Sequence, residues 1–468
     1  MNVYLETFGC QMNRLDSELV ATQLLLAGHV LVDDRKGADV VLYNTCSVRE
    51  HAEEKVYSRL GADAQRKANH RPGLIVGVLG CMAQRLGESL RKRFPAVDIV
   101  CGPGQLGRVA GLIEKAAAGE PGVALDPRRG EAPRAGDDDE ALDALDVARD
   151  PRQVPAAAQA YVRVARGCDN FCTYCIVPFV RGPERSRRPD RVVQEVRRLV
   201  DAGRSEVTLL GQTVNRYRYR PGGDRAGTVR FSDLLERVAS VDGLRRLRFV
   251  TSHPVDFGDD VLEAVRDLPT VCEYLHVPPQ SGSDAVLKRM KRGYTRSRYD
   301  DLVDRARAIV PGVVLAGDFI VGFSGETDRD HEASAELIRR SGFKNSFVFK
   351  YSPRPGTWAA EHLADDVPDD VKRRRNRELL AVQAEVSLAH HRGQVARTVE
   401  VLVEGPSVRA AKQAAKPTPE ATQLVGRTRG DHIVHFTGSL RLVGQYVRVR
   451  VTDATALALL GERAEGAP

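Results

Sequence analysis

Three cysteines lie within eight residues of the chain, in the stretch RGCDNFCTYCIVPFVRG. Cys168, Cys172 and Cys175 have a C-x3-C-x2-C spacing, and no fourth cysteine or histidine follows closely. Thiolates at this density select zinc or an iron–sulfur cluster. Structural zinc needs four protein ligands, and the available candidates, such as His253, are remote in sequence. A [4Fe–4S] cluster is the better account, because an iron without a protein ligand can bind substrate.

A second set of cysteines is spread over the first hundred residues. Cys10, Cys46 and Cys81 end the apolar runs VYLETFGC, DVVLYNTC and LIVGVLGC, at intervals of 36 and 35 residues. Such intervals suit successive βα units, and the carboxyl ends of parallel strands meet at one edge where ligands bind. We therefore expect a second metal or cluster site there. Cys101 and Cys272 lack this pattern, and we assign both to packing.

The elements that position these cysteines divide the chain into an α/β protein of several parts. Residues 1–117 alternate strand and helix signals, as in a parallel α/β sheet domain, and 118–157 read as an acidic, proline-rich linker. Residues 158–386 contain six strand-like runs between amphipathic helices, which predict a full or partial (β/α) barrel. Residues 390–460 predict a small antiparallel β-barrel, and 220–230 an exposed loop.

Length and composition are those of a globular protein without a membrane span. With 468 residues, 28% charged and 42% hydrophobic, the chain can form two or three domains with their own cores. No apolar run approaches the roughly 18 residues that a span requires. The start, MNVYLETFGCQMN, lacks the features of a signal peptide. We expect a cytoplasmic protein with no membrane partner, in which eight reduced cysteines bind metal rather than form disulfides.

Basic residues are concentrated in three clusters, at 181–198, 288–296 and 372–377, while 137–150 is acidic. The net charge is +7 although residues 137–150 are acidic, so the chain outside this segment is more basic than the total suggests. A single basic cluster is more often a solvated helix face. Three clusters around a metal motif instead favour binding to a nucleic-acid backbone.

The motifs together resemble the radical S-adenosylmethionine methylthiotransferases along almost the entire chain. The aromatic residue Tyr174 before the last cysteine of C-x3-C-x2-C is similar to the radical S-adenosylmethionine superfamily signature. The family resemblance rests on ETFGCQMN, NTCSVRE, VLGCMAQRL, RGCDNFCTYCIVPFVRGPERSR, LLGQTVN, RFVTSHP, QSGSDAVLKRMKRGYT, DFIVGFSGET and YSPRPGTWA, in this order. The C-terminal segment resembles the TRAM domain that the family uses to hold RNA. Two departures, the second proline of HVPPQSGS and Ser324 in GFSGET, leave the cysteines untouched.

The resemblance implies two [4Fe–4S] clusters and S-adenosylmethionine as cofactors. Cys168, Cys172 and Cys175 would be catalytic and carry the radical-generating cluster, while Cys10, Cys46 and Cys81 would carry an auxiliary cluster that holds the sulfur. One S-adenosylmethionine would methylate that sulfur. A second would yield the radical that removes hydrogen from C2 of an adenine next to the tRNA anticodon. NTCSVRE and CTYCIVPFVRGPERSR most resemble the family members that act on an adenine already bearing a dimethylallyl group.

The resemblance also implies partners and further site residues. The partners are the tRNA anticodon stem-loop, an electron donor such as flavodoxin or ferredoxin, and possible iron–sulfur assembly proteins. Candidate S-adenosylmethionine contacts are Tyr174, Gln212, Gln280 and Gly322, although strand packing explains Gly322 equally well. Candidate tRNA contacts are Arg181, Arg185, Arg187 and Arg188 after the cluster loop, with a solvated helix start as the alternative. The barrel would contribute Arg427, Arg429 and His432 from GRTRGDH.

Two other interpretations remain open from the sequence. Sister enzymes that act on threonylcarbamoyl-adenosine, or on an aspartate of a ribosomal protein, share both cysteine triplets, so the cysteines cannot separate them. A non-catalytic, zinc-bearing RNA-binding protein is the alternative of a different class. It predicts a colourless protein loaded with zinc, whereas two clusters predict iron and a broad absorbance near about 400 nm.

Overall fold

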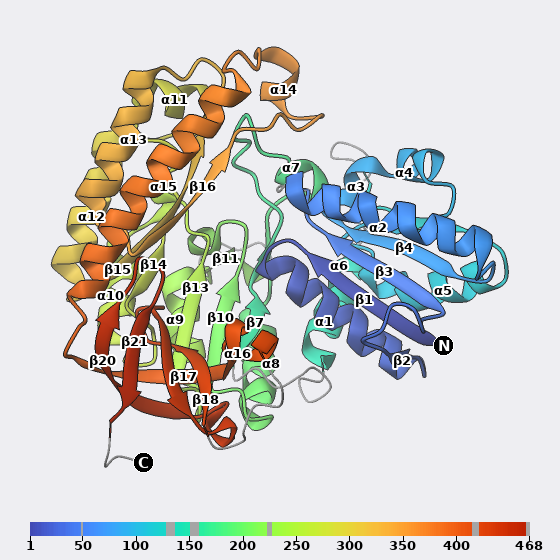
Figure 1. The fold of residues 1–468 in the computed structure, drawn as a ribbon, viewed down its shortest axis with the longest axis horizontal. Coiled ribbons are helices and arrows are strands. Elements are labelled where there is room, and N and C mark those ends of the chain that lie inside the picture. The colour runs from blue at the N-terminus through green and yellow to red at the C-terminus, as the bar shows by residue number, and fades with distance from the viewer. Residues whose placement is uncertain (48–49, 128–135, 150–158, 222–226, 414–420, 465–468) are drawn as a thin grey trace.

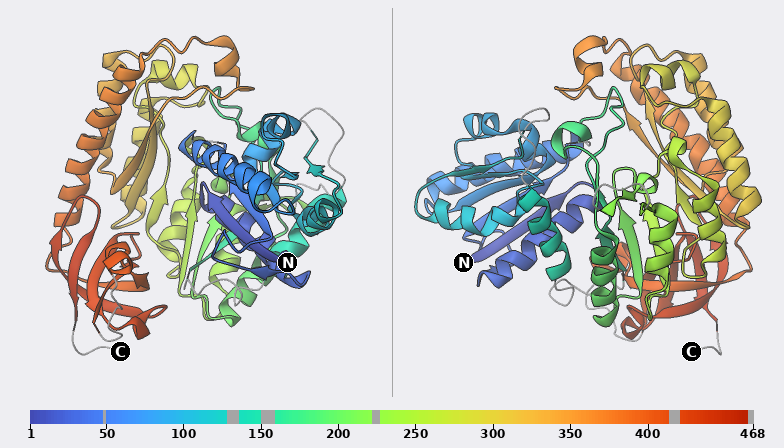
Figure 2. Two further views of the ribbon diagram at one scale, coloured as in Figure 1. Left: turned by 45° about the vertical axis from the view of Figure 1, so that its right-hand side comes forward. Right: turned by 180° about the vertical axis from the view of Figure 1, so that it is seen from behind.

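The computed structural model describes residues 1–468 except 48–49, 128–135, 150–158, 222–226, 414–420 and 465–468. The chain forms an N-terminal α/β domain, a central α/β domain and a C-terminal β-barrel (Figure 1). Two further views show that the central domain carries the other two on different sides (Figure 2). None of the helices in these described ranges combines the length and apolar composition that a membrane span requires.

The N-terminal domain is a parallel sheet of six strands in the order β2-β1-β3-β4-β5-β6. The strands are β1 (Asn2–Phe8), β2 (Val30–Leu31), β3 (Val40–Thr45), β4 (Ile75–Gly80), β5 (Ile99–Cys101) and β6 (Gly122–Ala124). One face packs against α1 (Gln11–Leu26), η1 (Leu106–Arg108) and α5 (Val109–Ala117). The other packs against α2 (Glu50–Asn69), α3 (Cys81–Leu86) and α4 (Glu88–Arg93). Because both faces are covered, β3 and β4 are buried at every position.

The central domain contains the six predicted strands, all parallel within two three-stranded sheets. The sheets are β13-β10-β7 and β14-β15-β16. A parallel bridge between Leu247 of β13 and Val271, shortly before β14, connects the two sheets. The strands are β7 (Gln159–Arg163), β10 (Glu206–Leu210), β13 (Arg246–Val250), β14 (Tyr274–His276), β15 (Val314–Val321) and β16 (Asn345–Lys350). Within the described ranges β7 and β16 do not pair, so the barrel is partial and open at this side.

Helices cover the outside of this partial barrel. They are α8 (Pro189–Asp201), α9 (Phe231–Ala239), α10 (Asp259–Asp267), α11 (Asp284–Arg289), α12 (Arg296–Ile309), α13 (Asp328–Ser341), α14 (Trp358–His362) and α15 (Asp369–Arg392). Ser283, Thr295 and Thr327 cap α11, α12 and α13, because each side-chain oxygen accepts a backbone N–H of the first turn. The left-handed Gly342 ends α13. These caps fix the residues at which α11, α12 and α13 begin, and the glycine fixes where α13 ends.

Shorter elements complete the central domain. They are β8 (Ala165–Arg166), α7 (Val177–Val180), β9 (Arg185–Ser186), η3 (Val214–Arg216), β11 (Arg218–Tyr219), β12 (Val229–Arg230) and η5 (Pro254–Asp256). β11 and β12 pair as an antiparallel hairpin. The exposed loop predicted at 220–230 therefore ends in a strand, and its residues 222–226 lie outside the described ranges.

The segment expected to be a linker contains two ordered elements. β6 joins the N-terminal sheet, so this domain extends beyond the expected boundary at residue 117. α6 (Gly136–Ala148) is a helix whose Asp146 is completely buried. Asp143 and Asp146 of this segment pair with arginines of the central domain and thus belong to the folded structure. Its parts at 128–135 and 150–158 lie outside the described residues.

The C-terminal domain is a closed barrel with strand order β17-β18-β19-β21-β20. Its elements are β17 (Thr398–Pro406), α16 (Val408–Gln413), β18 (Thr422–Arg427), β19 (Ile433–Gly438), η6 (Leu440–Leu442), β20 (Tyr446–Ala454) and β21 (Leu459–Arg463). The predicted barrel is present, although β19 and β21 run parallel to each other. Helix α15 continues past the expected end of the central domain at 386 and leads directly into the barrel (Figure 1).

Candidate active site

The three N-terminal cysteines meet at the carboxyl edge of the sheet. β1, β3 and β4 are neighbours whose last residues are in register. Cys10 is the N-cap of α1, Cys46 directly follows β3, and Cys81 is the first residue of α3. The expected convergence is therefore present in the structure. Their role as cluster ligands stays a prediction.

The electrostatic environment of these thiols favours a metal-binding form. A hydrogen bond with Cys46 lowers the pKa of Cys10 to about 6, and the positive charge of Arg181 acts in the same direction. Burial raises the pKa of Cys81, while Arg181 opposes this effect. Because the thiolate is the form that binds metal, a low pKa prepares Cys10 to act as a ligand at neutral pH.

Two glycines allow the chain to turn at the strand ends that carry these cysteines. Gly9 has φ +144°, and a Cβ at this position would lie 2.6 Å from the Cβ of Cys46. Gly80 has φ +87°, and its Cβ would lie 2.4 Å from Oδ1 of Asn44 and 2.9 Å from the carbonyl oxygen of Thr45. No side chain fits at either place. The backbones of neighbouring strand ends therefore approach closely because both residues are glycine.

The second triplet lies on the loop between β8 and β9, beyond the end of β7. Burial raises the pKa of Cys175 to about 12, and the neighbouring Cys172 and Cys168 add to this effect. Nη1 of Arg292 lies 3.4 Å from Sγ of Cys172, and Sγ of Cys168 lies 3.8 Å from Oγ1 of Thr213. The sequence C-x3-C-x2-C thus becomes a group of three neighbouring thiols, with Cys168 and Cys172 buried and Cys175 half-buried, beside a guanidinium.

The donor set suits two clusters better than two single ions. All eight cysteines are free thiols. Within the described ranges no group of three or more His, Cys, Asp or Glu side chains is arranged to hold one metal ion. Motifs that supply three cysteines each, without a fourth ligand close in sequence, suit a [4Fe–4S] core with one open iron. This arrangement disfavours the structural-zinc alternative.

The two triplets belong to different domains but lie at one junction. Cys81 packs against Ile176 and Val180, which directly follow the second triplet. Cys10 borders an apolar group formed by α1 and by the inward-facing ends of β7, β10 and β13. The carboxyl edge of the N-terminal sheet therefore closes on the carboxyl edge of the partial barrel.

The predicted S-adenosylmethionine contacts lie at this same edge of the central domain. The ring of Tyr174 meets that of Phe323 edge to face at 6.3 Å between centroids. Gln212 lies two residues beyond β10. Gln280 has φ +69°, and its backbone binds β15, since its N–H donates to the carbonyl oxygen of Asp318 at 2.9 Å. A left-handed glutamine is strained and marks functional sites. The ligand contacts themselves stay predictions.

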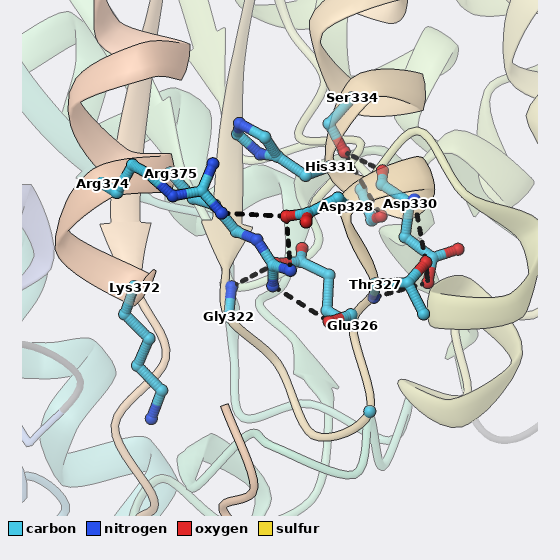
Figure 3. Close-up of polar contacts among 12 residues, drawn as sticks. Gly322, Glu326, Thr327, Asp328, Asp330, His331, Ser334, Lys372, Arg374 and Arg375 are labelled. Atoms are coloured by element: carbon cyan, nitrogen blue, oxygen red, sulfur yellow. Dashed lines mark hydrogen bonds and ion pairs between the residues drawn. The ribbon is translucent and has the colours of Figure 1, made fainter. Parts of the chain in front are cut away.

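Packing accounts fully for the glycine at position 322. Its N–H donates to Oε2 of Glu326 at 2.6 Å, and a Cβ there would lie 2.3 Å from Cγ of Lys372. Glu326 also accepts from Nη1 of Arg375 at 2.9 Å, and Arg375 reaches Asp328 at 3.0 Å (Figure 3). The packing explanation that the sequence left open is therefore supported by these contacts.

Two of the four arginines expected to bind tRNA phosphates are buried in ion pairs. Nη2 of Arg181 donates to Oδ2 of Asp16 at 2.8 Å. Nη1 of Arg187 donates to Oε2 of Glu195 at 2.7 Å, and its Nε donates to Oδ1 of Asp143 at the same distance. Neither arginine can reach a phosphate without leaving these partners, so the structure assigns both a role inside the protein.

The other two arginines lie closer to solvent. Arg185 is a half-buried residue of β9. Arg188 is exposed, and it donates two hydrogen bonds to Asp190, at 3.1 and 2.7 Å. An exposed pair of this kind opens at little cost. Arg185 and Arg188 thus remain candidates for tRNA phosphates.

Two of the three residues predicted to hold RNA in the barrel, Arg429 and His432, contact the central domain. Arg429 binds Glu273 with two hydrogen bonds, at 2.7 and 3.0 Å. His432 is buried, and its Nε2 lies 2.9 Å from Nε2 of His390 on α15. Arg427 pairs with Glu404 and with an aspartate of its own loop. The GRTRGDH loop is therefore a domain junction, which the sequence could not distinguish from an RNA surface.

Several residues of the barrel interior were not identified from the sequence. Because Phe319 packs outward against the helices, the residues beside it on β15 and β16 face inward. His276 lies 3.4 Å from Asp318 there, and Phe347 stacks on Phe349 at 6.2 Å between centroids. Phe347 is 53% exposed although it is a large apolar side chain. The alternation in NSFVFK could have identified these two aromatic residues.

Comparisons with known proteins agree with this architecture. Residues 2–102 match the family described as Uncharacterized protein family UPF0004, and residues 162–338 match the Radical SAM superfamily. The two matches divide the chain as the structure does, since each contains one of the cysteine triplets.

Curated relatives extend over the whole chain. A tRNA-2-methylthio-N(6)-dimethylallyladenosine synthase of Rhodopirellula baltica is 49% identical over 98% of this chain and 95% of that protein. The protein with the same description from Moorella thermoacetica is 44% identical over 98% of both chains.

A solved structure supports the fold alone. A radical S-adenosylmethionine methyltransferase, TsrM, from Kitasatospora setae superposes with a TM-score of 0.55 at 17% identity. The superposition covers 77% of this chain and 74% of that one.

Proposed function

This chain belongs to the family of tRNA-2-methylthio-N(6)-dimethylallyladenosine synthases, and we propose that it adds a methylthio group to C2 of N6-dimethylallyladenosine in tRNA. The observation that carries the proposal is the meeting of two cysteine triplets at one domain junction. Each motif supplies three cysteines, one fewer than the irons of a [4Fe–4S] cluster, so one iron of each cluster would be open to another molecule.

Cofactors supply the reactive chemistry, and the residues of the chain hold and orient them. When bound, the two clusters and S-adenosylmethionine supply a hydrogen-abstracting radical and the sulfur to be inserted, with an external donor such as flavodoxin or ferredoxin providing electrons. Cys168, Cys172 and Cys175 would hold the first cluster. Cys10, Cys46 and Cys81 would hold the second.

The surrounding side chains have supporting roles. Arg292 places a guanidinium group beside Cys172, with its Nη1 3.4 Å from the sulfur. The packing of Cys81 against Ile176 and Val180 places apolar side chains next to the N-terminal triplet. On the opposite inner wall, Phe347 offers an exposed ring on which a flipped adenine can stack. The chain therefore provides a site where a base can lie between a radical source and a sulfur source.

Single-cysteine variants test this assignment after anaerobic reconstitution. Cys46→Ala and Cys172→Ala should each lose about four iron atoms, which is the content of one cluster. Cys46→Ala should still cleave S-adenosylmethionine to 5′-deoxyadenosine but form no methylthio product, whereas Cys172→Ala should lose both reactions. Iron analysis, detection of 5′-deoxyadenosine and nucleoside mass spectrometry of tRNA measure these outcomes.

Cys101→Ala is the matched control for these variants. Cys101 also ends a strand of the same sheet but is buried in the apolar core, and its thiol donates to the carbonyl oxygen of Gln105 at 3.3 Å. It should keep all iron and both activities. Methylthiolated product from Cys46→Ala, or unchanged tRNA nucleosides in a strain lacking this gene, would refute the proposal.

A further inference from the structure

Arg181 links the segment that follows the second cysteine triplet to the N-terminal domain. It lies on the segment that carries the second triplet, six residues beyond Cys175, yet its side chain reaches the N-terminal domain. There the preceding residue, Val180, packs against Cys81, and the charge of Arg181 acts on the thiols of Cys81 and Cys10. Only 8% of the side chain is exposed, so solvent screens its charge weakly.

A buried carboxylate fixes the guanidinium in this place. Asp16 of α1 is fully buried and accepts from Arg181 at 2.8 Å and from Arg163 at 2.9 Å. Two guanidinium groups thus share one carboxylate, which leaves part of the charge of Arg181 available to another anion. The thiols beside it are the groups that become anionic when they bind metal.

We propose that Arg181 is a positioning residue for the auxiliary cluster: anchored by Asp16, it holds Cys81 against the segment of the second triplet and places a positive charge beside the cluster. This inference rests on the assignment of Cys10, Cys46 and Cys81 in the proposed function. A nearby buried cation favours addition of an electron, so Arg181 keeps the reduction potential of this cluster above the value that the three thiolates alone would give it.

Arg187 provides a matched control. It is an arginine of the same segment, with only 2% of its side chain exposed, and its carboxylate partners are Glu195 and Asp143. Loss of Arg187 therefore also breaks buried ion pairs. The structure places its charge among carboxylates, whereas that of Arg181 lies beside the cysteines.

The test uses the full chain with Cys168, Cys172 and Cys175 replaced by Ala, so that only the auxiliary site can be loaded. Arg181→Gln, Arg181→Lys and Arg187→Gln are made in this parent and reconstituted anaerobically. Iron content and a potentiometric titration followed by electron paramagnetic resonance are then measured. Arg181→Gln should lower the equilibrium constant for reduction at least tenfold, which is about 59 mV for one electron. Arg181→Lys should recover most of this shift, and Arg187→Gln should show none.

Each alternative outcome has a defined meaning. Loss of iron from Arg181→Gln, with normal loading of Arg187→Gln, also supports the proposal, since it shows that the guanidinium holds the ligand set together. An unchanged potential and iron content in Arg181→Gln would overturn it, as would an equal shift in Arg187→Gln. A parent that binds no iron would refute the cluster assignment itself, and the inference with it.

Discussion

The central domain has two junctions, one with the N-terminal domain and one with the C-terminal barrel, and arginines form both. At the N-terminal junction the charged groups are buried: Asp16 and Asp146 are 0% exposed and Arg163 is 2% exposed. At the barrel junction Arg429 and Glu273 are 31% and 36% exposed. There Arg248 donates to the backbone carbonyl oxygens of Thr428 and Arg429. His390 of α15 also contacts His432 of the barrel, with 2.9 Å between their Nε2 atoms.

The difference shows that basic residues alone do not indicate what a surface binds. At the first junction, buried pairs fix the two cysteine triplets relative to each other, which chemistry between them requires. The second junction holds a separate barrel in place, and it combines buried contacts of Arg246, Arg248 and Lys344 with the partly exposed pair of Arg429 and Glu273. Three predictions separate the two junctions experimentally.

The largest effect is expected at the N-terminal junction. Arg163→Ala removes the cation that binds both Asp16 and Asp146, at 2.9 and 2.8 Å. Because buried carboxylates then lose a partner, the free energy of unfolding should fall by about 3–5 kcal/mol. Chemical denaturation followed by circular dichroism measures the change. Arg188→Ala, which breaks an exposed pair with Asp190, should cost at most about 1 kcal/mol. Equal losses in the two variants would contradict the distinction.

Acidification should open the barrel junction before the N-terminal one. Burial lowers the pKa of His390 to about 4, with His391 and Lys344 adding to the effect. An unfolded histidine has a pKa near about 6.5, so the stability from the neutral ring is complete above this pH and is lost as pH falls towards 4. Burial alone would raise the pKa of Asp146, but Arg163 and Arg187 hold it well below its usual range, so its contribution is lost only below about pH 4.

Hydrogen exchange with mass spectrometry, carried out between pH 7 and 5, distinguishes the two junctions. After correction for the intrinsic rate, protection should fall in β17 and in the GRTRGDH loop, while β7 and α6 stay protected. Simultaneous loss of protection at both places would show that the histidines do not determine the pH response.

The smallest effect is expected for Arg429→Ala. Its pair with Glu273 is one-third exposed, so the free energy of unfolding should fall by about 1 kcal/mol, and exchange should increase at the barrel junction. Arg450→Ala is the control, because Arg450 pairs with Glu462 inside the barrel and is 60% exposed. Filter binding of tRNA at fixed salt adds a second measurement. A tenfold loss of affinity without any loss of stability would restore the RNA-binding role first expected for Arg429.

Local patterns predicted the strands and the placement of the cysteines well. The apolar runs before Cys10, Cys46 and Cys81 are strands that end at one edge, as expected for successive βα units. The six runs of the central domain are also strands. Such predictions depend on residues close together in the sequence, because strand length and alternation are local properties.

The partners of the charged residues could not be predicted in this way. DDDEALDALDVARD has the composition of an acidic linker, yet in the structure its Asp146 binds Arg163 and Arg166. Composition cannot distinguish a solvated carboxylate from a buried one, because the difference lies in distant residues. The interior position of Phe347 likewise depends on which neighbours β16 acquires.

By itself, the sequence determined the two cysteine triplets, the order of the domains and the family, because these depend on residue type and spacing. Only the tertiary structure decided that Cys81 packs against the segment after the second triplet and that Arg181 of this segment binds Asp16. Arg181 and Asp16 are 165 residues apart in the chain, and they bind only because two sheets close on each other edge to edge. An ion pair of this kind forms through long-range packing, which excludes water from both charges and thereby gives the pair its role.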